Sequence, residues 1–519
     1  MDLPFVVATL TRRGLLRPGS PARIAAQMQA LRRWGLTLSG ELRQAAARDP
    51  QRIAIIDERR GSITYGVLLD RAERLTRALY ARAGIEAGDR IGILCRNHAG
   101  MIEAMLAVTM LGADPVLANA GLSGPQLAAV ATDQGLRAII YDTDLAEITA
   151  GLPPHIDRLT EHDLDDLIAG APEGDLRTPG DVGRTIVLTS GTTGIPKGAR
   201  RPTPQGPGPL CAIIDRIPLR AHERIMIAAP IFHTWGYAGL QLALALRATI
   251  VLQRRFEPRT ALAAMAEHRC TALIAVPVML QRLLDVDTPE KSPGLRVVAV
   301  SGSALPGGLA TRFMNAYGQV LYNLYGSTEA SWASVATPTD LLRAPNTAGR
   351  PPHGTRISII GGDGTPADTG QVGRIFVGNE MLFEGYTSGG GKEMHDGMVG
   401  TGDLGHIDAD GLLFVAGRDD DMIVSGGESV FPSDVENLLA DLPQVREVSV
   451  VGVPDEVYGQ RLAAYLVLYP GETLDPDAVR EYVRRFRARF SVPRDVVYLP
   501  ELPRNAAGKV LTRTLPRSG

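Results

Sequence analysis

The sequence is poor in cysteine and carries little net charge. Its 519 residues include three cysteines, Cys95, Cys211 and Cys270, which are far apart and form no CxxC pair. This spacing excludes a disulfide framework, and a reducing cytoplasm is the simpler expectation for such a chain. The formal net charge of −3 excludes a strongly basic field, so we expect no binding of nucleic acid.

Long apolar runs are also missing. No run reaches the ~18 residues expected of a membrane span, and the N-terminus lacks the apolar core and cleavage site of a signal peptide. Residues 24–34 do have apolar side chains at helical spacing with arginines beside them. Such a helix either packs on the protein body, which is the commoner case, or lies on a membrane surface. Both interpretations stay open.

Lysine is the scarcest charged residue. Reading the chain gives four, Lys197, Lys291, Lys392 and Lys509, so nearly all of the 54 basic residues are arginine. A GC-rich genome could explain this bias, but not the positions at which lysine remains. Lys197 closes a segment rich in glycine and hydroxyls, and Lys509 lies in a tight-turn setting. We expect both positions to need a compact ammonium, which the planar guanidinium of arginine cannot replace.

The segment 189–198, Thr-Ser-Gly-Thr-Thr-Gly-Ile-Pro-Lys-Gly, follows an apolar run that predicts a buried strand. Glycines let backbone N–H groups converge on an anion, and hydroxyls and a lysine add further donors, so the segment predicts a phosphate cradle. It is not a Walker A loop, because Pro196 and Gly198 break the required spacing. Taken alone, a solvated turn-rich loop explains it equally well.

Five more segments follow this one in order. They are Tyr-Gly-Ser-Thr-Glu at 325–329, Thr-Gly-Asp at 401–403, Gly-Arg-Asp-Asp-Asp at 417–421, Gly-Gly-Glu at 426–428 and the Lys509 segment. Together the six resemble the signature motifs of the adenylate-forming superfamily, which includes acyl- and aryl-CoA ligases, luciferases and adenylation domains of peptide synthetases. The resemblance implies that an acid and ATP form an enzyme-bound acyl adenylate, which CoA then converts to acyl-CoA and AMP. It also implies Mg²⁺ as cofactor.

The pattern along the chain agrees with a fold of the α/β class. Strands and helices alternate over residues 41–345, which predicts two doubly covered, mostly parallel sheets. A β-rich subdomain is expected next, and a small mobile α+β domain after that. The predicted division is an N-terminal amphipathic extension at 1–40, a large ATP- and acyl-binding domain at 41–418 and a C-terminal domain at 419–519.

The resemblance assigns roles residue by residue. Glu329 and, more weakly, Thr189 would bind Mg²⁺, although an isolated glutamate is usually a solvated surface group. Tyr325 would stack on adenine, and Asp403 and Arg418 would bind the ribose. The catalytic candidates are Lys509, Glu329, Lys197 and His233. The ATP-binding candidates are Thr189, Ser190, Gly191, Thr192, Thr193, Gly194, Lys197, Gly302, Ser303, Asn323, Tyr325, Gly326, Thr328, Asp403, Arg418 and Lys509.

The remaining assignments concern the acid, the hinge and CoA. His233, Trp235, Gly302 and Leu324 are expected in the acyl pocket, although a lone histidine is more often structural. Asp420 matches the hinge about which the C-terminal domain rotates. Gly426, Gly427 and Glu428 are expected near the thiol of CoA.

A narrower resemblance concerns the substrate. The segments Arg96-Asn97-His98 and Arg200-Arg201-Pro202, with Leu324 and Met398, resemble actinobacterial fatty-acyl-CoA ligases. We therefore expect a cytoplasmic fatty-acid–CoA ligase. One alternative hands the fatty-acyl adenylate to a carrier protein, but the short junction at 417–432 has no insertion that would block CoA. Another is an inactive fatty-acid- or nucleotide-binding module, which the intact motif residues disfavour. Homodimer formation and peripheral membrane contact stay open.

Overall fold

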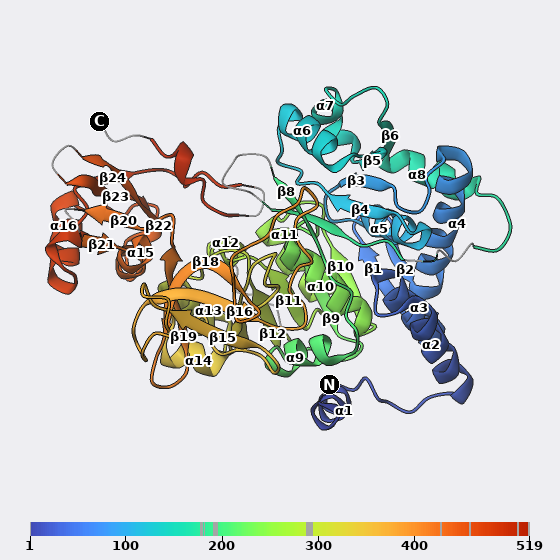
Figure 1. The fold of residues 1–519 in the computed structure, drawn as a ribbon, viewed down its shortest axis with the longest axis horizontal. Coiled ribbons are helices and arrows are strands. Elements are labelled where there is room, and N and C mark those ends of the chain that lie inside the picture. Colours follow the sequence, from blue (N-terminus) through green and yellow to red (C-terminus); the bar gives the residue numbers. More distant parts are fainter. Residues whose placement is uncertain are drawn as a thin grey trace.

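The computed structural model describes residues 2–176, 180, 182–189, 196–286, 294–425, 428–455, 458–505 and 508–516. Two mostly parallel sheets form the large N-terminal part, and a small unit, red in Figure 1, forms the C-terminal end. The predicted α/β fold class is confirmed.

The first large sheet has the strand order β14-β13-β12-β11-β9-β10-β1-β2. Its inner strands pair in parallel, and β2 and β14 pair antiparallel at the two edges. Parallel neighbours need helical crossovers that bury both faces, and β10, β11 and β12 are accordingly short runs of fully buried residues. The strands are β1 (Ile53–Asp57), β2 (Gly61–Thr64), β9 (Arg224–Ile227), β10 (Thr249–Leu252), β11 (Ala272–Ala275), β12 (Val297–Val300), β13 (Leu321–Tyr325) and β14 (Ser334–Ala336).

The second large sheet has the order β6-β5-β3-β4-β7-β8, with β7 and β8 forming an antiparallel pair at one edge. The apolar run expected before the phosphate segment is β7, and its first three residues are buried. The strands are β3 (Arg90–Leu94), β4 (Asp114–Leu117), β5 (Ala138–Tyr141), β6 (Asp157–Thr160), β7 (Ile186–Thr189) and β8 (Lys197–Arg200).

Helices cover both sheets. Two of them, α5 and α10, are apolar on nearly every side and are buried along almost their whole length, as such composition requires. The helices of the large part are α1 (Leu3–Arg12), α2 (Pro21–Trp34), α3 (Leu38–Arg48), α4 (Tyr65–Ala83), α5 (Ala99–Leu111), α6 (Gly124–Gln134), α7 (Ala146–Thr149), α8 (Glu161–Ala169), α9 (Gly208–Arg216), α10 (Thr234–Ala245), α11 (Pro258–Glu267), α12 (Pro277–Leu284), α13 (Gly307–Tyr317) and α14 (Pro338–Arg343).

The amphipathic N-terminal stretch forms most of α2, which lies alongside α3. Its Trp34 is buried, and the guanidinium of Arg43 lies 4.1 Å from the Trp34 ring centroid. Ile24 and Met28 face solvent. The helix therefore packs on the protein body through one face only. Among the described residues, no helix is long and apolar enough to cross a membrane.

A β-rich part and the C-terminal unit complete the chain. The first is an antiparallel sheet of β15 (Arg356–Ile360), β16 (Gly373–Gly378), β17 (Met394–His395), β18 (Met398–Ile407) and β19 (Leu413–Arg418). The second contains β20 (Ile423–Ser425), β21 (Glu428–Val430), α15 (Pro432–Ala440), β22 (Val445–Asp455), β23 (Gly459–Leu468), α16 (Pro476–Phe486) and β24 (Asp495–Tyr498). It has a hydrophobic core of its own, to which both helices contribute.

The C-terminal unit touches the large part at a few points. Arg446 Nη2 lies 2.6 Å from Asp285 Oδ2, and α15 contacts α13. The loop that carries Lys509 reaches further, because Gly508 lies against Val278 at the start of α12. These contacts place Lys509 at the carboxyl ends of the strands of the first sheet.

Candidate active site

A cavity of about 1190 Å³ opens where strands of both large sheets end. Thr189 lines it at the end of β7, Ser301 and Gly302 line it after β12, and Lys509 enters from the C-terminal unit. Ligands of open α/β sheets bind at the carboxyl ends of the strands, so this cavity is the candidate active site.

The phosphate segment meets this cavity at both ends. Thr189 and Lys197 are directly paired residues of the β7–β8 hairpin, and both line the cavity. The Nζ atom of Lys197 lies 5.5 Å from the Tyr386 ring centroid, a cation–π contact. Ser190, Gly191, Thr192, Thr193 and Gly194 lie outside the described residues, so their predicted role stays a prediction.

Glu329 is a buried carboxylate on the cavity wall. The hydroxyl of Tyr386 donates a hydrogen bond to Glu329 Oε1 over 2.7 Å. Burial, and then the Glu329 charge, raise the pKa of Tyr386 well above its ordinary value, so this hydroxyl stays a donor. Arg201 is buried nearby and donates to the carbonyl oxygen of Thr328 over 2.7 Å.

Tyr325, Asp403 and Arg418 come together from three strands. Asp403 and Arg418 are cross-strand partners in β18 and β19, with Arg418 Nη1 3.5 Å from Asp403 Oδ1. Tyr325, at the end of β13, donates its hydroxyl to Asp403 Oδ2 over 2.6 Å. Burial raises the pKa of Asp403, although Tyr325 and Arg418 act in the opposite direction. The predicted adenosine residues are thus neighbours.

The acyl-pocket candidates also share the cavity. His233, Trp235, Gly302 and Leu324 all line it. Burial lowers the pKa of His233 to about 4, and its buried Nε2 has no hydrogen-bond partner among the described residues. A neutral imidazole with an unused nitrogen can accept or donate one hydrogen bond to a bound molecule.

Among the described residues, four predicted ATP residues are not part of the cavity wall: Ser303, Asn323, Tyr325 and Asp403. Asn323 is buried within β13, and Ser303 follows the wall residue Gly302. Gly326 and Thr328 do line the cavity. A side chain at Gly326 would place its Cβ 2.3 Å from the carbonyl oxygen of Ser331, so the close chain approach there requires glycine.

Lysine accumulates at this cavity. Lys197, Lys392 and Lys509 all line it, and Lys291 lies outside the described residues. Lys509 and Lys392 are close enough to Asp403 to favour its charged form. The backbone N–H of Lys509 donates to the side chain of Asn505 over 2.9 Å, which closes the turn that carries it.

The hinge and CoA candidates lie at the edge of the site. Asp420 follows β19 and lines the cavity, with Oδ1 3.4 Å from Arg418 Nε. Gly426 and Gly427 lie outside the described residues, and Glu428 starts β21 with an exposed side chain. The cavity wall does not include Glu428.

Sequence reasoning missed Tyr386, Arg201 and Lys392. The scarcity of lysine is a signal that could have identified Lys392. Arg201 stands out in the sequence only as part of an uncommon Arg-Arg-Pro. Tyr386 lies outside the motifs, and the residues around it do not indicate a role in the site. Only folding brings its hydroxyl to Glu329.

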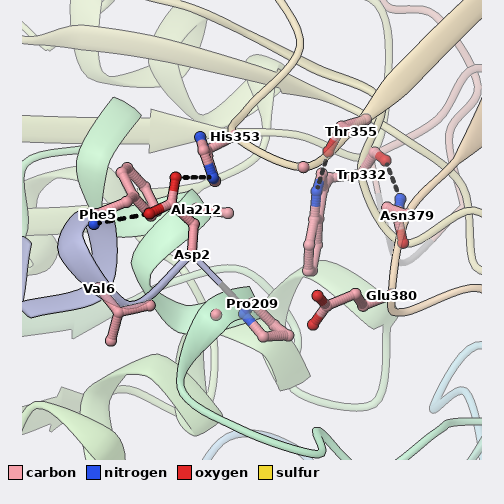
Figure 2. A pocket seen from close by; sticks show the side chains of 12 residues that line it. Asp2, Phe5, Val6, Pro209, Ala212, Trp332, His353, Thr355, Asn379 and Glu380 are labelled. Carbon is pink, nitrogen blue, oxygen red and sulfur yellow. Dashed lines mark hydrogen bonds and ion pairs between the residues drawn. The ribbon is translucent and has the colours of Figure 1, made fainter.

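A second, smaller pocket of about 230 Å³ lies beside α1. Figure 2 shows Asp2 and Phe5 on one side of it and Trp332, Asn379 and Glu380 on the other. Phe5 stacks on His353 with ring centroids 3.9 Å apart, which ties α1 to the β-rich part. Trp332 lines both this pocket and the large cavity. The small pocket holds no lysine or motif carboxylate, so the large cavity remains the candidate site.

Comparisons with known proteins cover nearly the whole chain. The profile of the AMP-binding enzyme family matches residues 42–387, and that of the AMP-binding enzyme C-terminal domain matches residues 434–509. The chain is 34% identical to 2-succinylbenzoate–CoA ligase of Geobacillus kaustophilus, covering 93% of this chain and 98% of the relative. It is 32% identical to indoleacetate–CoA ligase of Aromatoleum aromaticum, covering 92% and 96%.

Two solved structures resemble the fold. The o-succinylbenzoate CoA synthetase of Bacillus subtilis, in complex with its acyl-adenylate intermediate, has a TM-score of 0.81 and 28% identity and covers 92% of this chain and 98% of its own. The fatty acyl CoA synthetase of Mycobacterium tuberculosis has a TM-score of 0.71 and 26% identity, covering 92% and 97%.

Proposed function

We propose that this chain, a member of the AMP-binding enzyme family and an AMP-forming acyl-CoA ligase, acts on a fatty acid. The fatty acid would be held in the large cavity. In the first half-reaction a carboxylate oxygen attacks the α-phosphorus of ATP, and the bond to pyrophosphate breaks. In the second, the thiol sulfur of CoA attacks the acyl carbon, AMP leaves with the bonding electrons and the thiol loses its proton.

Lys509 is assigned to the first half-reaction. The observation that carries this role is its place on the same cavity wall as Lys197, Glu329 and Arg418. A positive charge at that point stabilises the negative charge that develops on the carboxylate and the α-phosphate oxygens. Asp403, with two oxygens facing Tyr325 and Arg418, is assigned to the vicinal hydroxyls of the ribose.

The residues present fit Mg²⁺. Glu329 uses one oxygen for the Tyr386 hydroxyl, and the hydroxyl of Thr189 stands on the same wall. Mg²⁺ prefers oxygen ligands and keeps several waters, so one carboxylate and a weaker hydroxyl suffice. Bound there, the ion would neutralise phosphate charge. Tyr386 fixes the orientation of the Glu329 carboxylate.

One face of α10 supports an extended acid. Most of its residues on the cavity wall recur at helical spacing, and the full set is Thr234, Trp235, Gly236, Ala238, Gln241, Leu242 and Ala245. Eleven residue steps at 1.5 Å each span about 16 Å. Three backbone bonds of an extended peptide span roughly 3.5 Å, or about 1.2 Å per bond. A chain of up to about fourteen carbon atoms would therefore fit this length, which accommodates an acid of twelve carbons, and the apolar neighbours on the wall suit a hydrocarbon.

An aromatic acid is the second candidate. It is favoured by the names of relatives that act on succinylbenzoate and indoleacetate. The test is mass-spectrometric detection of acyl-CoA and AMP from purified protein, Mg-ATP, CoA and acids from acetate to oleate, with aryl acids included. Thioesters from a band of chain lengths near twelve carbons support the fatty-acid proposal. Thioesters from aryl acids alone refute it, acyl-AMP without thioester indicates a carrier-protein acceptor, and no product indicates a binding module.

Peripheral membrane contact remains part of this proposal. The side chains of Ile24 and Met28 on α2 are 38% and 54% exposed, beside several arginines. Their replacement by glutamine leaves the buried face of α2 intact, so it should reduce co-sedimentation with anionic liposomes without unfolding the protein. Unchanged co-sedimentation would leave α2 with a packing role alone.

A further inference from the structure

The far end of the large cavity is polar. Glu41 of α3 lines the cavity there, next to Leu36, which precedes the helix. The carboxyl end of α10 is close by, because Gln44, one turn after Glu41, hydrogen bonds to the carbonyl oxygens of Leu244 and Ala245 over 3.3 and 3.4 Å. The Glu41 carboxylate therefore lies on the cavity wall at the carboxyl end of α10.

The Glu41 side chain has unused hydrogen-bonding capacity. Gln44 Nε2 donates to Glu41 Oε2 over 3.1 Å, and in the part of the chain that the structure describes this is the only hydrogen bond to the carboxylate. Arg247 is the nearest opposing charge, yet burial still raises the pKa of Glu41 to about 7. An ionised carboxyl has about four acceptor sites, so a donor from a bound molecule would find one free.

Gln241 adds a second polar group on the same stretch. It lies on the cavity face of α10 one turn before Ala245, and no hydrogen bond of its side chain occurs among the described residues. The side chains of Gln126 and Asn119, by contrast, already make local hydrogen bonds. Gln126 forms a capping box with Ser123 at the start of α6, and Asn119 accepts a hydrogen bond from the Gly121 N–H. Glu41 and Gln241 are thus the wall groups available to a ligand at this end.

We propose that Glu41 selects acids that carry a hydroxyl or amino group at the end opposite the reacting carboxylate, such as an ω-hydroxy acid of about twelve carbons. This inference rests on the proposed function, since it assumes that the acid lies along α10 with its carboxylate near Lys509. The terminal hydroxyl or amino group of the acid would donate the hydrogen bond that water gives to the Glu41 carboxylate when no acid is bound. An acid with a plain methyl end leaves Glu41 buried without that partner, which costs binding.

The experiment compares kcat/KM for dodecanoate and 12-hydroxydodecanoate in the wild-type enzyme, Glu41→Leu and Glu41→Gln. The assays are run above pH 8, where Glu41, with its pKa of about 7, is ionised. A hydrogen bond to a charged group is worth about 1.5–3 kcal/mol, so we expect the preference for the hydroxy acid to fall about ten- to hundredfold in Glu41→Leu. Glu41→Gln keeps a neutral acceptor and should fall in between. Turnover of dodecanoate in each variant shows that the variant is folded.

An unchanged ratio in Glu41→Leu, with dodecanoate still converted, would overturn the inference and leave the proposed function intact. If the wild-type enzyme converts neither these acids nor any other fatty acid of the panel, the proposed function fails. Calorimetric binding of the two acids then tests Glu41 separately: a loss of affinity for the hydroxy acid alone in Glu41→Leu supports its role, and equal affinities in wild type and variant refute it.

Discussion

At the scale of single residues, the cavity is marked by its cations. Lys197, Lys392 and Lys509 line it in a chain that uses arginine nearly everywhere else. Lysine is a compact, mobile point charge, whereas arginine is a planar fork suited to fixed bidentate partners. In adenylation, negative charge shifts from the attacking carboxylate through the α-phosphate to the leaving pyrophosphate. A mobile cation can follow that shift, which gives the lysine bias a chemical reason.

Lys509→Ala tests this reason most directly. We expect adenylate formation to fall about 10²–10³-fold, as for loss of one transition-state charge contact, while thioester formation from supplied acyl-AMP is largely retained. The two half-reactions are measured separately, by pyrophosphate release and by acyl-CoA formation. Lys509→Arg, which keeps the charge but not its shape, is the matched control and should lie between. Equal losses in both half-reactions would contradict the assignment.

His233 leads to a prediction about pH. Burial lowers its pKa to about 4 in the folded protein, against about 6.5 in an unfolded chain. The neutral imidazole therefore stabilises the fold fully above pH 6.5, and this contribution is lost as the pH falls from 6.5 towards 4. Between pH 7 and 4.5 the wild-type protein should lose about 2 kcal/mol more unfolding free energy than His233→Asn.

Urea denaturation at the two pH values measures this difference. His162→Asn, at an exposed histidine of α8, is the control and should follow the wild type. If His233→Asn shows the same pH dependence as wild type, His233 is not held neutral by burial.

At the scale of elements, the short connection between β19 and β20 joins the large part to the C-terminal unit. Asp420 lies there, exposed, with its carboxylate 3.4 Å from Arg418. Proline fixes φ near −65°, so Asp420→Pro should leave adenylation within a few-fold of wild type and stop thioester synthesis. Asp420→Ala removes only a weak exposed ion pair and should affect neither half-reaction strongly. Loss of both half-reactions in the proline variant would argue against a hinge.

Much of this architecture could be predicted from the sequence, because motifs follow strands. The run before the phosphate segment is β7, and the motifs at 325–329 and 417–421 come at the ends of β13 and β19, whereas the motif at 401–403 lies within β18. What the sequence could not predict are contacts between distant side chains. Tyr386 reaches Glu329 across 57 residues, and Glu41 reaches the far end of the cavity through α3 packing on α10. Such contacts depend on tertiary packing and have no local pattern.

At the scale of the whole molecule, the structure has the arrangement that we assign to the first half-reaction. Lys509 is in the cavity, while Glu428, the CoA candidate, is exposed outside its wall. The contacts between the two parts include the Arg446–Asp285 ion pair, the hydrogen bond from Gln281 to Tyr469, the approach of α15 to α13 and β19, and the contact of Gly508 with Val278. Polar side-chain contacts of this kind fit the prediction that the C-terminal unit rotates between the two half-reactions.

A substitution at Gly508 tests whether the contact between the C-terminal unit and α12 is needed for adenylation. Its φ of 81° favours glycine, and a Cβ there would lie 2.5 Å from Val278 Cγ1. Gly508→Ala should therefore disfavour docking and lower adenylation about tenfold, the effect of a steric cost between 1 and 3 kcal/mol, while thioester formation from acyl-AMP persists. Gly471→Ala is the matched control, since Gly471 has φ 83° and no neighbour within 4 Å of its Cβ position. In both variants alanine must adopt a positive φ, which costs a similar amount of free energy. If both lose adenylation equally, strain at the substituted backbone explains the loss. The contact with Val278 would then not be needed for the first half-reaction.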